Sequence, residues 1–122
     1  MKKLLVVLVL LLVAGFVFAD NVDLSKLPKG KWLDANWDAV WEIGANSIRI
    51  LDLNGKEVFN FNNLISDFEY GASLTEARFS FRCDEAGRNY VFRKGLTDLD
   101  LVLEMQRDWT SETYSVKMPF QK

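Results

Sequence analysis

The sequence predicts an all-β domain built from antiparallel strands. Apolar and polar residues alternate with a period of two through most of the chain after Trp37, and residues typical of tight turns separate the alternating segments. This alternation is typical of strands with one face in a core and the other in water, whereas a helix would spread these apolar residues around its axis. The length of 122 residues suits a single domain.

Eight segments carry the alternation. The clearest is Leu99–Met105, in which apolar residues take every second position. Between segments, Asn54-Gly55 is the strongest hairpin signal because both residue types tolerate positive φ. Since the connections are short, successive strands are expected to pair as hairpins. The segments cover residues 37–43, 47–51, 58–62, 68–70, 78–83, 90–93, 98–105 and 114–118.

The predicted architecture is a small antiparallel eight-stranded up-and-down barrel formed by residues 20–122. Closure into a barrel would remove both exposed sheet edges, which is a common solution for strands with one apolar face. A β-sandwich of the same strands is the alternative.

Residues 1–19 are predicted to be a signal peptide. Lys2 and Lys3 form a basic start, an apolar run follows, and Ala19 is a small residue before the expected cleavage site at Asp20. The apolar run from Leu4 to Ala19 would span about 24 Å as a helix, less than the ~30 Å of a bilayer core. We therefore expect a bacterial protein that is periplasmic or secreted, with no stable membrane span after signal cleavage.

Composition argues against several functions. The net charge of −2 provides no basic surface for nucleic acid, and the absence of His removes the commonest general base and metal ligand. Cys83 is the single Cys, so an intramolecular disulfide and a Cys-cluster zinc site are excluded. We expect a non-enzymatic protein with no catalytic residue, no metal and no cofactor.

Gly30-Lys31-Trp32 follows a short lead segment without alternation. It resembles the Gly-x-Trp signature of the lipocalin family and its calycin relatives. In that family the Trp closes one end of the barrel and packs against an Arg on or after the last strands. The resemblance implies that Trp32 and Arg107 are the barrel-closing pair, in an up-and-down barrel with an apolar pocket for a small lipophilic molecule.

The inward positions are rich in aromatic residues, and this leaves two functions open. An eight-stranded barrel has an interior just wide enough for its own side chains or for one small ligand. The first hypothesis is a small exported lipocalin-like binding protein for an apolar or amphipathic molecule. The alternative is a filled barrel that acts through its outer surface, as an envelope interaction module with an envelope protein as partner or as an inhibitor of a secreted enzyme. The candidate ligand-binding residues are Trp37, Trp41, Phe81, Tyr90 and Phe92.

Overall fold

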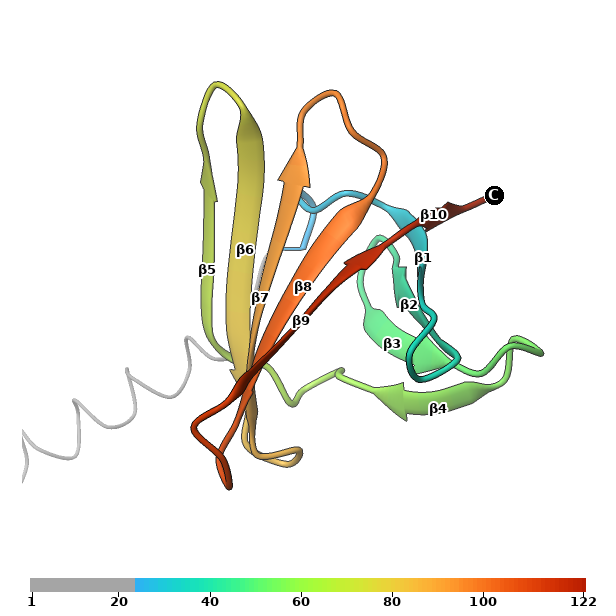
Figure 1. Ribbon diagram of the computed structural model, residues 1–122, viewed down its shortest axis with the longest axis vertical. Coiled ribbons are helices and arrows are strands. Elements are labelled where there is room, and N and C mark those ends of the chain that lie inside the picture. Colours follow the sequence, from blue (N-terminus) through green and yellow to red (C-terminus); the bar gives the residue numbers. More distant parts are fainter. Residues whose placement is uncertain (1–23) are drawn as a thin grey trace, which may run out of the picture.

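The computed structural model describes residues 24–122, which form two antiparallel sheets of five strands each (Figure 1). Sheet 1 has the strand order β10-β1-β2-β3-β4, and sheet 2 has the order β5-β6-β7-β8-β9. The strands of sheet 1 are β1 (Gly30–Asp34), β2 (Ala39–Ile43), β3 (Ile48–Leu51), β4 (Glu57–Asn60) and β10 (Phe120–Gln121). Those of sheet 2 are β5 (Ser66–Ala72), β6 (Glu76–Cys83), β7 (Arg88–Gly95), β8 (Leu101–Arg107) and β9 (Thr113–Met118).

The predicted all-β class is confirmed, and each of the eight expected segments overlaps one of the strands β2 to β9. Successive strands within sheet 2 pair as antiparallel neighbours, as expected for a meander. The structure adds β1 and β10, which pair with each other at the edge of sheet 1. The predicted signal peptide, residues 1–19, lies outside the described residues.

The closed barrel is not confirmed, because the two sheets do not form one continuous ring of hydrogen bonds. The outer strands β4 and β5 each pair with one neighbour only. On the other side, the last stretch of chain passes from sheet 2 into sheet 1 as β9 and β10, with Pro119 between them (Figure 1). Proline lacks an N–H donor and therefore interrupts a ladder, but the Pro119 carbonyl accepts the Leu33 N–H at 3.0 Å. The two sheets are thus joined at this side.

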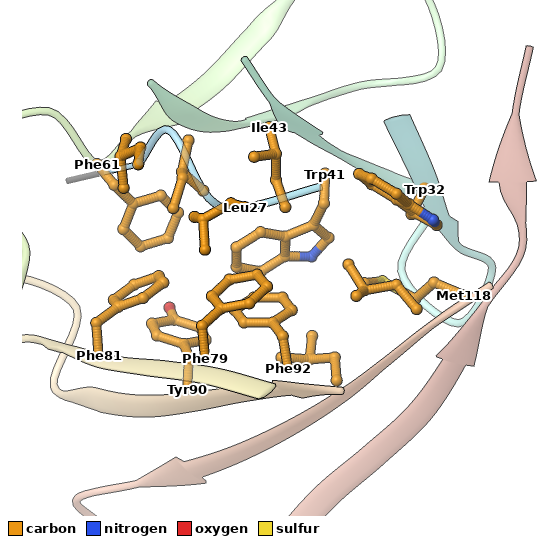
Figure 2. Close-up of a cluster of buried hydrophobic side chains, with 14 of the residues drawn as sticks. Leu27, Trp32, Trp41, Ile43, Phe61, Phe79, Phe81, Tyr90, Phe92 and Met118 are labelled. Atoms are coloured by element: carbon orange, nitrogen blue, oxygen red, sulfur yellow. The ribbon is translucent and has the colours of Figure 1, made fainter. Parts of the chain in front are cut away.

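Aromatic side chains fill the space between the sheets (Figure 2). Trp41 from sheet 1 stacks on Phe61 at 5.4 Å between ring centroids, and it meets the ring of Phe92 edge-on at 5.2 Å. Phe79 and Phe92, which face each other on β6 and β7, stack at 4.7 Å. Such ring pairs add stabilisation to that of burial itself, so this cluster is the main packing element of the domain.

Gly30 and Trp32 pack together with Phe120 at the start of β1. A Cβ atom on Gly30 would lie 2.7 Å from the ring of Phe120, which is too close for any other residue without movement. Trp32 is buried, contacts Phe120 edge-on at 5.6 Å, and donates its indole N–H to the Leu99 carbonyl at 2.8 Å. The glycine of the Gly-x-Trp sequence therefore allows β10 to pack closely against β1.

The structure does not bring Trp32 and Arg107 together, which corrects the expectation that they form a barrel-closing pair. Trp32 is bonded to Leu99, just before the start of β8, whereas Arg107 is the last residue of that strand. A seven-residue strand is about 20 Å long at 3.3 Å per residue, so the two side chains lie at opposite ends of β8.

Trp37 was expected on the inner face of a strand, and this was wrong. The chain turns between β1 and β2, where the Asp34 carbonyl accepts the Trp37 N–H at 3.2 Å and Asp38 has a φ of 51°. In the sequence the alternation includes Trp37, but in the structure this residue lies in the turn before β2. Trp37 is 66% exposed. Leu99, also at an inward position of the alternation, lies in the irregular segment before β8 and is 62% exposed.

Arg82 links the β6–β7 turn to the β8–β9 turn. Both terminal nitrogens of Arg82 donate to the Asp108 carboxylate, at 3.0 and 2.7 Å, and its Nε donates to Asp84. The Arg82 hydrogen bond lowers the pKa of Asp108 below the ordinary value of 3.8. A carboxyl with a lowered folded-state pKa stabilises the fold above its unfolded-state pKa and loses this contribution as the pH falls through the folded-state value.

We predict that Arg82→Gln makes the stability of the protein less sensitive to acid. The urea midpoint of wild type should exceed that of Arg82→Gln above pH 3.8, and the difference should shrink as the pH falls below it. Arg78→Gln is the matched control, because Arg78 is exposed and forms no ion pair within residues 24–122. A difference between wild type and Arg82→Gln that stays constant down to about pH 2 would contradict the prediction.

Candidate functional site

A cavity of about 230 Å³ lies between the two sheets and is here called the inter-sheet cavity. Its lining comes from β1, the β1–β2 turn, β2 and β3 on one side, and from β7, β8 and β9 on the other. It occupies the end of the molecule where the β1–β2, β6–β7 and β8–β9 turns lie. The filled aromatic core borders the cavity on its inner side, since Trp41 and Tyr90 belong to both.

The inner wall of the cavity is apolar. Trp41 and Ile50 contribute from sheet 1, and Tyr90, Leu103 and Met105 contribute from sheet 2. They reach the same space because Trp41 is paired with Ile50 and Tyr90 with Met105 across neighbouring strands, which puts each pair on one face. Burial raises the pKa of Tyr90, and a hydrogen bond with Arg88 opposes that rise. The wall therefore offers apolar contact with one phenol hydroxyl.

Asp34 is the buried carboxylate of the cavity. It is 3% exposed, and both of its oxygens accept the Tyr114 hydroxyl, at 3.0 and 2.9 Å. The Asn36 backbone N–H donates to the same carboxylate at 3.0 Å, and the Asn36 side chain donates to the Tyr114 oxygen at 2.9 Å. Burial and the neighbouring Asp34 charge raise the pKa of Tyr114, so its hydroxyl keeps its proton near neutral pH. The Asp34 carboxylate therefore already has hydrogen-bond donors from the β1–β2 turn and from β9.

Two arginines complete the lining. Arg88, the first residue of β7, is directly opposite Arg107, the last residue of β8. The Arg88 guanidinium lies over the ring of Trp109 at 5.3 Å from its centroid. The Nε atoms of Arg88 and Arg107 are both buried and without a hydrogen-bond partner. Neither arginine forms an ion pair with any residue in the described part of the chain.

The predicted ligand-binding residues divide between this cavity and the core. Trp37, Trp41 and Tyr90 line the cavity, with Trp37 at its exposed border. Phe81 and Phe92 do not line it, because both are buried among other aromatic rings. Phe81 stacks against Phe92 at 6.0 Å, and Figure 2 shows both pointing from sheet 2 into the cluster.

Sequence reasoning missed Arg88 and gave Arg107 a different role. A signal for both was present in the alternation. Arg88 stands two residues before the inward Tyr90, and Arg107 stands two residues after the inward Met105. Extending the inner face by one step at each strand end would have placed both arginines inside the domain. Their direct opposition depends on strand register, which the pattern alone does not provide.

Three further features of residues 24–122 concern metal ligands, the cysteine and membrane-spanning helices. No group of three or more His, Cys, Asp or Glu side chains in residues 24–122 is arranged to hold a metal ion. Cys83 is buried and has no disulfide partner in that range. Within the same residues, no helix is long and apolar enough to cross a membrane.

Comparisons with protein-family models, with curated proteins and with solved structures found no match for this chain. The evidence for a function comes from the geometry of the inter-sheet cavity.

Proposed function

We propose that this protein binds a small apolar or amphipathic molecule in the inter-sheet cavity. The observation that carries the proposal is a cavity between two sheets whose inner wall combines Trp41, Tyr90 and aliphatic side chains with a few polar groups. Ligand sites typically have this composition, an apolar lining with a small number of placed polar groups. The volume of about 230 Å³ is below the ~300–1,000 Å³ common for drug-sized ligands, which favours a small molecule.

The proposed activity is binding without catalysis. The sequence has no His to activate a nucleophile, and its single Cys is buried, so we propose no nucleophilic catalysis. We also propose that the protein is exported to the periplasm or the outside of a bacterial cell, on the basis of residues 1–19. A lipocalin-like arrangement is also part of the proposal. The Gly30-x-Trp32 sequence at the start of β1 and the meander of sheet 2 support it.

We predict that filling the cavity weakens binding strongly. Ala39 lines the cavity, so Ala39→Leu should lower the affinity for a naphthyl ligand about tenfold or more while the protein stays folded. Isothermal titration calorimetry with 2-naphthoate and with its neutral analogue 2-naphthamide measures this affinity. Ala72→Leu is the matched control, because Ala72 is an exposed strand residue outside the cavity. Failure of wild type to bind either compound saturably would overturn the proposed function.

A second candidate function uses the opposite end of the domain, as an interaction surface for an envelope protein. Leu74 in the β5–β6 turn is 96% exposed, and Leu96 and Leu99 in the β7–β8 turn are also exposed. The Leu96 N–H donates to the Thr75 carbonyl at 3.0 Å, so the two turns touch. Exposed apolar residues that gather in this way are typical of protein contacts.

A photo-cross-linker at position 74, used in the native cell envelope, should give one discrete adduct, and Leu96→Ser should reduce its yield. The absence of any adduct would contradict this candidate.

A further inference from the structure

We propose that the ligand of the inter-sheet cavity is a small organic anion whose charged group binds between Arg88 and Arg107. Its apolar part would pack on the wall formed by Trp41 and Leu103. This inference rests on the proposed function and adds the chemical class of the ligand.

The first support is the direct opposition of the two arginines. Arg88 and Arg107 are cross-strand partners in neighbouring strands, and both line the cavity. Like charges in directly opposite positions of a sheet destabilise it, because the two side chains lie side by side. An anion between the guanidinium groups would turn this repulsion into two attractions. The arrangement is therefore costly in the empty protein and favourable in a complex with an anion.

The second support is the contrast with the three arginines that form ion pairs; Arg78 also forms none within residues 24–122, but its side chain is exposed. Arg49, Arg82 and Arg93 each form ion pairs with carboxylates on the protein. Arg88 has only the Tyr90 hydroxyl and the Trp109 ring as partners, and the Arg107 side chain has no hydrogen-bond partner in the described residues. Buried N–H groups without partners are uncommon and destabilising. The unused Nε–H donors of both arginines belong to side chains that line the cavity.

The third support is the charge of the whole lining. The lining contains two guanidinium groups and one carboxylate, Asp34, and that carboxylate already accepts hydrogen bonds from Tyr114 and Asn36. The cavity thus has an excess of positive charge beside an apolar wall. A guanidinium presents its N–H groups in a planar fork that matches the two oxygens of a carboxylate. Together with the small volume, these features select a compact molecule with an apolar body and one anionic group.

The test compares 2-naphthoate with 2-naphthamide, which share a ring system and nearly the same size but differ in charge. Affinities for both are measured by isothermal titration calorimetry with wild type, Arg88→Met, Arg107→Met and Arg78→Met. Wild type should bind naphthoate about tenfold or more tightly than naphthamide, as charge-assisted hydrogen bonds require. Each of Arg88→Met and Arg107→Met should reduce this ratio towards one without lowering the affinity for naphthamide. Arg78→Met removes the same charge at an exposed position outside the cavity, so it should keep the wild-type ratio.

Naphthamide binding also shows whether the cavity persists in each variant. A methionine variant that loses naphthamide as well is replaced by the glutamine variant at the same position and judged by the same ratio. If wild type binds both compounds equally, the cavity is a ligand site but the anion inference is overturned. The same holds if both cavity variants keep the preference for naphthoate. If wild type binds neither compound, the proposed function itself fails.

Discussion

Phe92→Ala is expected to lower the free energy of unfolding by about 3–5 kcal/mol, as is typical of a buried Phe replaced by Ala. Phe92 is fully buried, stacks on Phe79 at 4.7 Å and contacts the edge of Trp41 at 5.2 Å. Truncation would remove these ring contacts and leave a cavity between the sheets, because surrounding side chains relax only partially into such a space. Since domains of this size are stable by only about 5–15 kcal/mol, the urea midpoint should fall steeply.

Two further variants test whether the buried ring itself is the source of this cost. Val91→Ala is the matched control: Val91 is half-buried on the opposite face of β7, so its truncation should cost about 1 kcal/mol or less. Phe92→Leu should retain much of the stability and should bind naphthamide like wild type, because Phe92 does not line the cavity. A cost for Phe92→Ala no larger than that for Val91→Ala would contradict the aromatic core.

Gly30→Ala is expected to be the second most damaging of the predicted changes, with a cost of about 1–3 kcal/mol. Gly30 has a φ of 150°, which other residues rarely adopt, and a Cβ would lie 2.7 Å from the Phe120 ring. The strain should loosen the packing of β10 on β1. Urea unfolding of the variant measures the cost.

Glycine substitutions elsewhere separate backbone strain from collision. Gly55 also has a positive φ, 85°, but a Cβ there would meet nothing within 4 Å, so Gly55→Ala should cost less than Gly30→Ala. Gly71→Ala, with open space and no positive φ, should be nearly neutral. In a Phe120→Leu background, Gly30→Ala should lose part of its cost, because the colliding ring is gone. Equal costs in both backgrounds would show that the ring does not matter.

The structure places only some of the predicted site residues beside the cavity, and strand register explains the difference. The alternation identified Trp41 and Tyr90 as inward residues, and both line the cavity. It also identified Phe81 and Phe92 as inward, but these pack in the filled centre. A period of two assigns a residue to one face of a strand, but it does not say where in the space between the two sheets the side chain lies. That position depends on which strands pair and in what register.

The sequence by itself determined the all-β class, the positions of eight strands and the aromatic face of sheet 2, because side-chain alternation is a local property of an extended chain. Only the tertiary structure decided that the strands divide into two sheets, that β10 crosses to β1 after Pro119, and that Trp37 lies in a turn. It also decided that Arg88 and Arg107, 19 residues apart in the chain, are directly opposite each other beside the cavity. These features result from pairing between distant segments, whose geometry is set by packing and hydrogen bonding across the whole domain.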